Sequence, residues 1–167
     1  WDRSHLHIVL VGDLAHGRTA HSKVDGLRLF DKVKVDLVAP QSLAYPVEYR
    51  TRMRSNGFDV REFQSLEEYL EQAAGSLAKV WYFYKPRFDR CGDLSQNAVN
   101  QLRSKVTFRP EWQSRLPPEA RFFQTLPRDK EHPVVPLAFD GLPLNNWDRV
   151  ANNAYFLNIV LLGMLFG

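Results

Sequence analysis

Cysteine is almost absent from this sequence, which contains one such residue, Cys91, among 167. A lone cysteine excludes an internal disulfide and any metal site built on several cysteines, and it suits a reducing cytoplasm. We therefore expect a cytoplasmic protein that binds no metal. A hydrophobic segment of the kind found in signal peptides is also missing at the start, because residues 1–7 are mostly polar, and no signal peptide is expected.

An excess of charge of one sign is lacking as well. The 22 Lys and Arg residues and the 19 Asp and Glu residues leave a formal net charge of +3. This charge is too small to indicate nucleic-acid binding, and no basic stripe interleaved with aromatic residues occurs. A small anionic ligand is compatible with it. The hydrophobic content of 44% and the charged content of 25% are typical of one globular domain.

No apolar run reaches the roughly 20 residues that a bilayer span requires, so we expect no membrane insertion. The longest run, AYFLNIVLLGMLFG at residues 154–167, predicts a helix that is apolar on nearly all sides. Such a helix needs surfaces around it. We expect residues 154–167 to dock on another chain or on a domain outside this one.

Strand-like runs alternate with helical patterns along the chain. The expected strands lie at residues 8–11, 33–38, 58–63, 79–84 and 120–125. The expected helices lie at residues 19–30, 42–56, 65–74 and 146–166, and the polar connection 86–105 has a weaker helical pattern at its centre. The alternation predicts parallel strands joined by right-handed crossovers. The expected fold is therefore α/β: a doubly wound, mainly parallel five-stranded sheet with helices on both faces, a Rossmann-like three-layer sandwich.

Cap residues support these helix limits. Ser42 is expected to cap the helix over 42–56, and Gly57 to end it. Ser65 and Glu68 have the spacing of a capping box, and Gly75 is expected to end that helix.

The most informative segment is IVLVGDLAHGRTAHS, at residues 8–22. Its apolar run predicts a strand buried on both faces, which ends at Gly12 and Asp13. Gly17 and Arg18 then open a helix, whose first N–H groups attract an anion. A guanidinium there is a planar fork suited to a carboxylate or phosphate. The segment therefore predicts an anion site.

Known motifs fit this segment poorly. GDLAHGRT has the spacing of a P-loop, but Arg18 stands where that loop needs lysine, and the glycines of a dinucleotide fingerprint are missing. His16 and His21 are five residues apart and do not share a helical face, so hydrogen-bonding or solvated roles are favoured over a metal site. Asp13 either orients an arginine or caps a neighbouring N–H. No cofactor is expected.

Cations follow three of the expected strands at their carboxyl ends, where ligands bind in such sheets. They are Arg18; Lys85, Arg87 and Arg90; and Arg128 and Lys130. No arrangement of Ser, His and Asp or of paired carboxylates stands out, so the sequence gives no support for a protein nucleophile, and no catalytic residue is assigned.

Four segments together resemble the aspartate-binding half of the aspartate carbamoyltransferase family. They are GDLAHGRTAHS at 12–22, VDLVAP at 35–40, LPR at 126–128 and PLNNWDRVANNAYFLNIVLLGML at 143–165. The resemblance covers nearly the whole chain and identifies residues 1–167 as a C-terminal, aspartate-binding domain. The ornithine branch fits less well, because its Trp-Ser-Met-Gly signature is missing after the fourth strand.

The resemblance implies transfer of a carbamoyl group from carbamoyl phosphate to L-aspartate, a step of pyrimidine biosynthesis, without a cofactor. In the family an N-terminal domain binds carbamoyl phosphate. That domain is expected in the same or another chain, with residues 146–167 forming a terminal helix that packs on it. This chain would be active only with that domain, in a trimer-based homo-oligomer.

The resemblance also assigns substrate-binding roles. Arg18 would hold one carboxylate of aspartate, while Lys85 and Arg87 stand where the family has an arginine and a glutamine for the second. The backbone at Leu126 would line the amino-group side, and Arg128 would brace its loop.

Three further residues are expected to support the substrate-binding residues. Asp13 would act behind the binding residues, and Gln124 and Thr125 replace the family's His-Pro. Because residues 84–87 depart from the family, two alternatives stay open. One is a non-catalytic paralogue acting as a regulatory or scaffold subunit, and the other is a carbamoyltransferase with a different amino acceptor.

Overall fold

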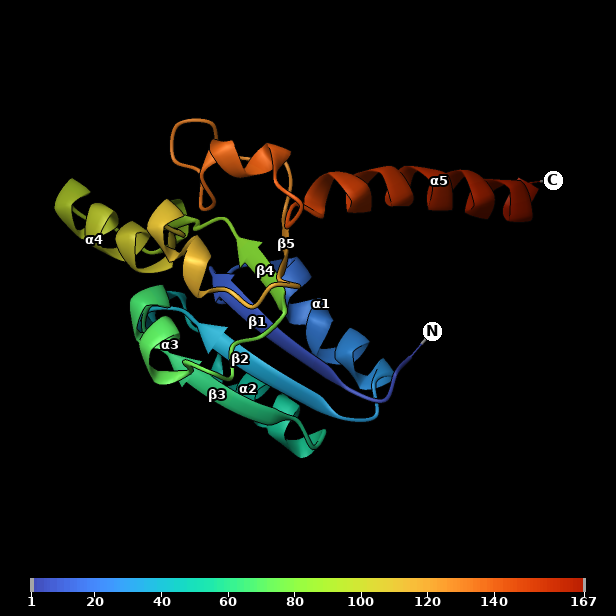
Figure 1. The fold of residues 1–167 in the computed structure, drawn as a ribbon, viewed down its shortest axis with the longest axis horizontal. Helices are drawn as coiled ribbons and strands as arrows, with labels where there is room; N and C mark the ends of the chain where they lie inside the picture. The colour runs from blue at the N-terminus through green and yellow to red at the C-terminus, as the bar shows by residue number, and fades with distance from the viewer. Residues whose placement is uncertain (1, 167) are drawn as a thin grey trace.

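The computed structural model describes residues 2–166, which form one five-stranded parallel sheet (Figure 1). Every neighbouring pair of strands is parallel, in the order β3-β2-β1-β4-β5. The strands are β1 (Leu6–Gly12), β2 (Val33–Val38), β3 (Asp59–Phe63), β4 (Val80–Tyr84) and β5 (Arg121–Gln124). The expected doubly wound α/β sheet is confirmed.

The strand order reverses between β1 and β4. From β1 the chain moves outward through β2 to β3, then returns to the other side of β1 and continues through β4 to β5. The loops leaving β1 and β4 therefore diverge, and they open a crevice at the carboxyl ends of these strands. Any ligand site is expected at that point.

Four α-helices and four short 3-10 turns lie between the strands of the described chain, and a fifth turn and a fifth helix follow β5. The helices are α1 (Arg18–Gly26), α2 (Val47–Ser55), α3 (Leu66–Gln72), α4 (Gln96–Val106) and α5 (Trp147–Phe166). The turns are η1 (Leu27–Leu29), η2 (Gln41–Leu43), η3 (Phe88–Arg90), η4 (Pro110–Arg115) and η5 (Leu137–Gly141).

Alternate residues of β1 enter two separate hydrophobic cores. Val9 and Val11 belong to the core that includes α3, while Ile8 and Leu10 belong to the core that includes α1 and α2. Val9, Leu10 and Val11 are each 0% exposed. The prediction that this strand is buried on both faces is confirmed, and helices cover both sides of the sheet.

One expected helix start was wrong, and another was confirmed. Ser42 caps no α-helix, because η2 occupies Gln41–Leu43 and α2 begins only after Pro46. A proline disfavours helical backbone in the residue before it, so the helix starts beyond it. At α3, the Ser65 side chain accepts the Glu68 N–H at 3.1 Å as predicted. The Glu68 carboxylate, however, accepts the N–H of Gln64 and not that of Ser65.

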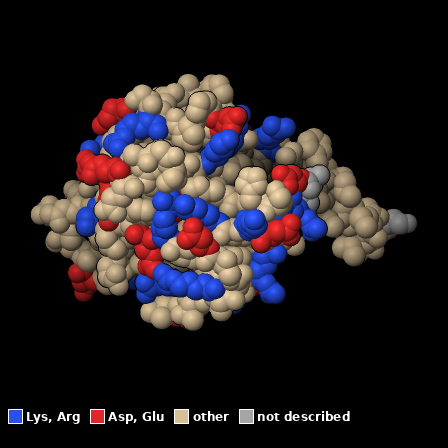
Figure 2. All heavy atoms as spheres, turned by 60° about the horizontal axis from the view of Figure 1, so that its bottom comes forward, with Lys and Arg blue, Asp and Glu red and all other residues tan. Residues whose placement is uncertain are grey.

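Helix α5 projects from the rest of the molecule (Figure 1). Most of its apolar side chains are exposed. Phe156 is 62% exposed and Leu165 74%. Figure 2 shows basic and acidic side chains interspersed on one face of the molecule, and a protruding end of α5 that carries neither. Over the described part of the chain, α5 has the length and mean hydropathy (1.2) of a possible membrane span. Residues 154–166 thus lack a covering surface here, and Gly167 lies outside the described residues.

Candidate anion-binding site

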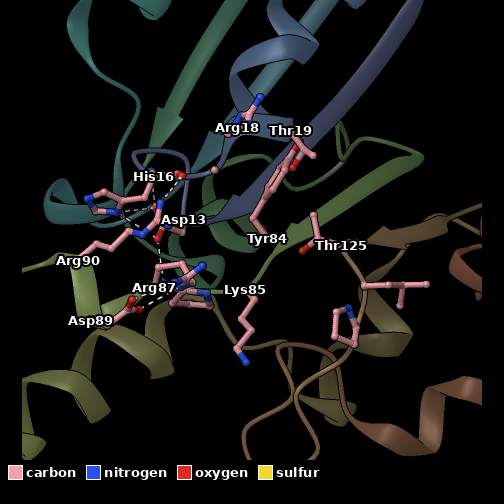
Figure 3. Close-up of a pocket in the computed structure, with 14 residues that line it drawn as sticks. Asp13, His16, Arg18, Thr19, Tyr84, Lys85, Arg87, Asp89, Arg90 and Thr125 are labelled. Atoms are coloured by element: carbon pink, nitrogen blue, oxygen red, sulfur yellow. Dashed lines mark hydrogen bonds and ion pairs between the residues drawn. The ribbon is translucent and has the colours of Figure 1, made fainter.

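A cavity of about 530 Å³ lies at the carboxyl ends of β1, β4 and β5 (Figure 3). Residues from the three loops that follow these strands line it. They are Asp13, His16, Gly17, Arg18 and Thr19; Tyr84, Lys85, Pro86, Arg87, Asp89 and Arg90; and Thr125, Leu126 and Pro127. The topology thus brings together three segments that are far apart in the sequence.

Gly12 allows the first two loops to approach each other. It has a φ of +109°, and a Cβ at this position would lie 2.1 Å from the carbonyl oxygen of Tyr84. A side chain at position 12 would therefore push β1 and β4 apart at the cavity floor.

The Asp13 carboxylate joins these loops directly. It is 1% exposed, and its Oδ2 accepts the backbone N–H of Arg87 at 2.9 Å. Its Oδ1 accepts the backbone N–H of His16 at 2.9 Å and lies 3.1 Å from His16 Nδ1. The expected capping role is present, because Asp13 accepts the backbone N–H of His16. Its contact with Arg87 is to the backbone, and the Arg87 guanidinium binds Asp89 instead.

The loop after β1 is held from its other side as well. The carbonyl of Leu43 accepts the N–H groups of Leu14 and Ala15, at 2.9 and 3.0 Å. His21 Nε2 lies 3.1 Å from the Leu14 carbonyl oxygen, and its ring stacks on Tyr49 with centroids 4.2 Å apart. The hydrogen-bonding roles expected for His16 and His21 are present.

Arg18 opens α1 at the rim of the cavity. Gly17 caps this helix without a side-chain hydrogen bond, which leaves the first N–H groups of α1 available to an anion. The Arg18 side chain is exposed, and no ion pair joins it to another described residue. Figure 3 shows the Arg18 and Lys85 side chains pointing in opposite directions.

Two of the three cations expected after β4 already have acidic partners. Lys85 Nζ lies 2.9 Å from Asp129 Oδ2, and the Arg87 guanidinium forms two hydrogen bonds with Asp89, at 2.9 and 3.1 Å. The backbone N–H of His132, together with Lys85, lowers the pKa of Asp129 to about 2. Both cations line the cavity, but each would have to share its charge with a ligand.

Only some of the residues predicted in the third loop line the cavity. Thr125 and Leu126 line the cavity, and the Leu126–Pro127 peptide bond is cis. Arg128 does not line it, because its guanidinium donates to the Asp140 carboxylate and the Val135 carbonyl and lies over the Trp147 ring. This contact suits a brace for the loop. Gln124 is buried among core residues and also stays out of the cavity.

Sequence reasoning gave no binding role to Arg90 or Tyr84, which both line the cavity. Arg90 donates to the carbonyl of His16 at 3.4 Å, from the far side of Asp13. The cation-rich loop after β4 was the signal for it. Tyr84 is 2% exposed, and its hydroxyl has no hydrogen-bond partner among the described residues. Nothing in the sequence distinguished it from the other aromatic residues of β4.

The cavity is rich in basic side chains. Four cations surround the opening, and among residues 2–166 no group of three His, Cys, Asp or Glu side chains fits a metal ion. A guanidinium and a helix N-terminus lie on one wall and an ammonium on another, and each of these groups attracts anions. The fold and cavity therefore define a doubly wound α/β domain with a candidate anion-binding pocket at its switch point.

Comparison with known proteins identifies relatives of this chain. Protein PyrBI of Treponema denticola is 48% identical over all of this chain, which spans 31% of that protein. The aspartate carbamoyltransferase catalytic subunit of Dichelobacter nodosus is 29% identical over 96% of the chain, which spans 45% of the subunit. No family model matches the chain.

Solved structures agree with the fold. The catalytic subunit of M. jannaschii aspartate transcarbamoylase superposes with a TM-score of 0.72 at 23% identity, over 87% of this chain and 44% of that one. An aspartate transcarbamoylase of Trypanosoma cruzi, solved in complex with aspartate and phosphate, gives 0.70 at 20% identity, over 89% and 47%. The chain is homologous to a part of the aspartate carbamoyltransferases, and it spans less than half the length of these relatives.

Proposed function

We propose that this chain is the L-aspartate-binding part of an aspartate carbamoyltransferase. The observation that carries the proposal is Arg18, a cation without an acidic partner in the described chain, at the rim of a cavity lined by three loops. The homology to aspartate carbamoyltransferases supports L-aspartate as the acid and carbamoyl phosphate as the donor. The enzyme would supply N-carbamoyl-L-aspartate for pyrimidine biosynthesis.

Each wall of the cavity has a role in this proposal. Arg18 and the start of α1 bind one carboxylate of aspartate, and Lys85 and Arg87 bind the second. Leu126 presents its backbone to the amino group, while Asp13, Gln124, Thr125 and Arg128 hold the loops. Catalysis then depends on orientation and on charge stabilisation of the transition state, and these do not require a covalent intermediate.

The uncovered face of α5 supports a second domain as its partner. We propose that residues 146–167 pack on a carbamoyl-phosphate domain, in the same polypeptide or in another. A protein surface explains α5 better than a bilayer, because Asp148, Arg149 and three asparagines interrupt its apolar sequence. A trimer-based homo-oligomer in the cytoplasm completes the proposal.

The test is carbamoyl transfer by the complete natural polypeptide, with any partner subunit it requires. We expect formation of N-carbamoyl-L-aspartate, with kcat/KM reduced by roughly 10- to 150-fold in Arg18→Ala, the range for a lost hydrogen bond to a charged group. Arg28→Ala removes an exposed arginine of η1 and is the matched control. Failure of the wild-type protein to carbamoylate aspartate would disprove the proposal.

A different amino acceptor is the second candidate, favoured by the loop after β4. Pro86 fixes the backbone there, and both Lys85 and Arg87 are held by acidic side chains. An acceptor with a bulkier or less charged side chain would suit that wall. A panel of amino acids assayed for carbamoylation distinguishes this candidate, because another acceptor would then exceed L-aspartate in kcat/KM.

A further inference from the structure

Lys85 and Asp129 form an ion pair between two different loops of the cavity. Lys85 follows β4 and Asp129 follows β5, and their charged atoms lie 2.9 Å apart. The pair therefore ties together two of the three segments that line the cavity. Its effect depends on which partner is fixed and which is free to move.

Asp129 is the fixed partner. Its Oδ1 accepts the backbone N–H groups of Glu131 and His132, both at 3.0 Å, so the carboxylate is part of a local turn. Its side chain is 24% exposed, against 48% for Lys85. The carboxylate thus keeps its position through its own backbone contacts, independently of the lysine.

Lys85 is the partner with the longer and more flexible side chain. It lines the main cavity and also a smaller one of about 190 Å³, which Asp129 and His132 line as well. A lysine ammonium stands on a flexible four-carbon stem, whereas the planar fork of an arginine is pre-organised. Without a tether, a ligand that uses this cation must bear the cost of ordering its side chain.

We propose that Asp129 is a positioning residue for the acceptor site, which holds the Lys85 ammonium at the cavity wall where a dicarboxylic acceptor places its second carboxylate. This inference rests on the proposed function. Asp129 touches no substrate and acts only through Lys85. A binding wall that uses lysine requires such a partner, because the lysine does not order itself.

A matched control lies at the opposite ends of the same two strands. Lys79 precedes β4 and Glu119 precedes β5, and their side chains form an ion pair far from the cavity. Both are largely exposed, at 64% and 67%. Glu119→Gln therefore removes a similar pair from the same strands without altering the cavity.

The kinetic test uses Asp129→Asn in the complete natural polypeptide. The asparagine oxygen can still accept the N–H groups of the turn, while the charge that holds Lys85 is lost. We expect the KM for L-aspartate to rise about three- to tenfold, the cost of ordering one long side chain, with kcat changed less than about twofold. In a Lys85→Met background, Asp129→Asn should add nothing, and Glu119→Gln should leave both constants unchanged.

A second measurement does not depend on activity. Acetylation of lysine amines by an N-hydroxysuccinimide ester, followed by mass spectrometry, should label Lys85 several times faster in Asp129→Asn than in the wild type. Lys79 should respond only to Glu119→Gln. An unchanged KM, or an increase in KM that persists in the Lys85→Met background, would overturn the positioning role. Faster labelling in a protein that carbamoylates no aspartate would support the tether and refute the proposed function.

Discussion

The Asp13 carboxylate accepts the backbone N–H of Arg87 at 2.9 Å, across 74 positions of the sequence. Asp13 directly follows β1, and Arg87 lies in the loop that follows β4. One buried acidic side chain therefore sets the spacing of the two loops on either side of the switch point. This contact makes the geometry of the cavity depend on a carboxylate that is 1% exposed.

Replacing Asp13 by asparagine should damage the site more than the fold. The amide keeps one acceptor oxygen, but its nitrogen would face an N–H group of His16 or Arg87. We expect kcat/KM for carbamoyl transfer to fall by roughly 10- to 100-fold, since a hydrogen bond to a charged group contributes about 1.5–3 kcal/mol. Far-UV circular dichroism should be unchanged. Activity within twofold of the wild type would contradict this role.

Removing the Asp36 carboxylate should lower the free energy of unfolding more than removing any other carboxylate. Its side chain is 0% exposed, and it accepts hydrogen bonds from Arg61, from Tyr69 at 3.0 Å and from His7 at 2.6 Å. Breaking a buried pair from one side costs about 3–5 kcal/mol. We expect a loss of this size in the free energy of unfolding for Asp36→Asn, measured by urea denaturation. Asp59→Asn, which removes an exposed carboxylate 3.9 Å from Lys34, should cost less than about 1 kcal/mol.

The same residue should shape the dependence of stability on pH. Burial alone would raise the pKa of Asp36, but the hydrogen bonds from His7 and Arg61 outweigh it and hold the pKa below its ordinary value. A lowered folded-state pKa gives stability that is present above the unfolded pKa, near 3.9, and lost as the pH falls towards the folded one. Urea midpoints between pH 3 and 7 should therefore fall less steeply in Asp36→Asn. An identical acid limb in both proteins would disprove the linkage.

The two buried tyrosines of the α1-side core should respond oppositely to loss of the hydroxyl. Tyr45 donates to the carbonyl of Ala20 at 2.7 Å, whereas the Tyr84 hydroxyl has no partner among the described residues. Tyr45→Phe should lower the free energy of unfolding by about 1 kcal/mol, and Tyr84→Phe should leave it unchanged or raise it. Thermal unfolding of the two variants tests this, and a larger loss in Tyr84→Phe would show that its hydroxyl is bonded.

Charged substitutions on α5 should matter only where a second domain is present. Leu161 and Leu165 are exposed in this chain, at 45% and 74%. Leu161→Glu and Leu165→Glu should change the stability of residues 1–167 by less than about 0.5 kcal/mol, as expected for surface positions. The complete polypeptide should lose about 2–5 kcal/mol per substitution, the range for large apolar side chains removed from a core. Equal effects in both would refute packing of α5 on another domain.

The sequence by itself determined the order of elements and the place of the candidate site. The strand runs are continuous and apolar because parallel strands are buried on both faces, and this made β1 and β2 recognisable. The motif at 12–22 indicated an anion site because a glycine, an arginine and a helix start are adjacent in the chain. These signals are local, so they can be read without the fold.

Only the tertiary structure decided which of the predicted residues meet. It places Arg87 against the Asp13 carboxylate, pairs Lys85 with Asp129, and turns Arg128 away towards Val135 and Asp140. Each contact joins a loop to a segment that is remote in the sequence or folded back on it, and no periodicity or spacing encodes such a contact. The fold follows from the burial of apolar residues, whose positions the sequence gives directly. The pairing of charges depends on where three loops come together.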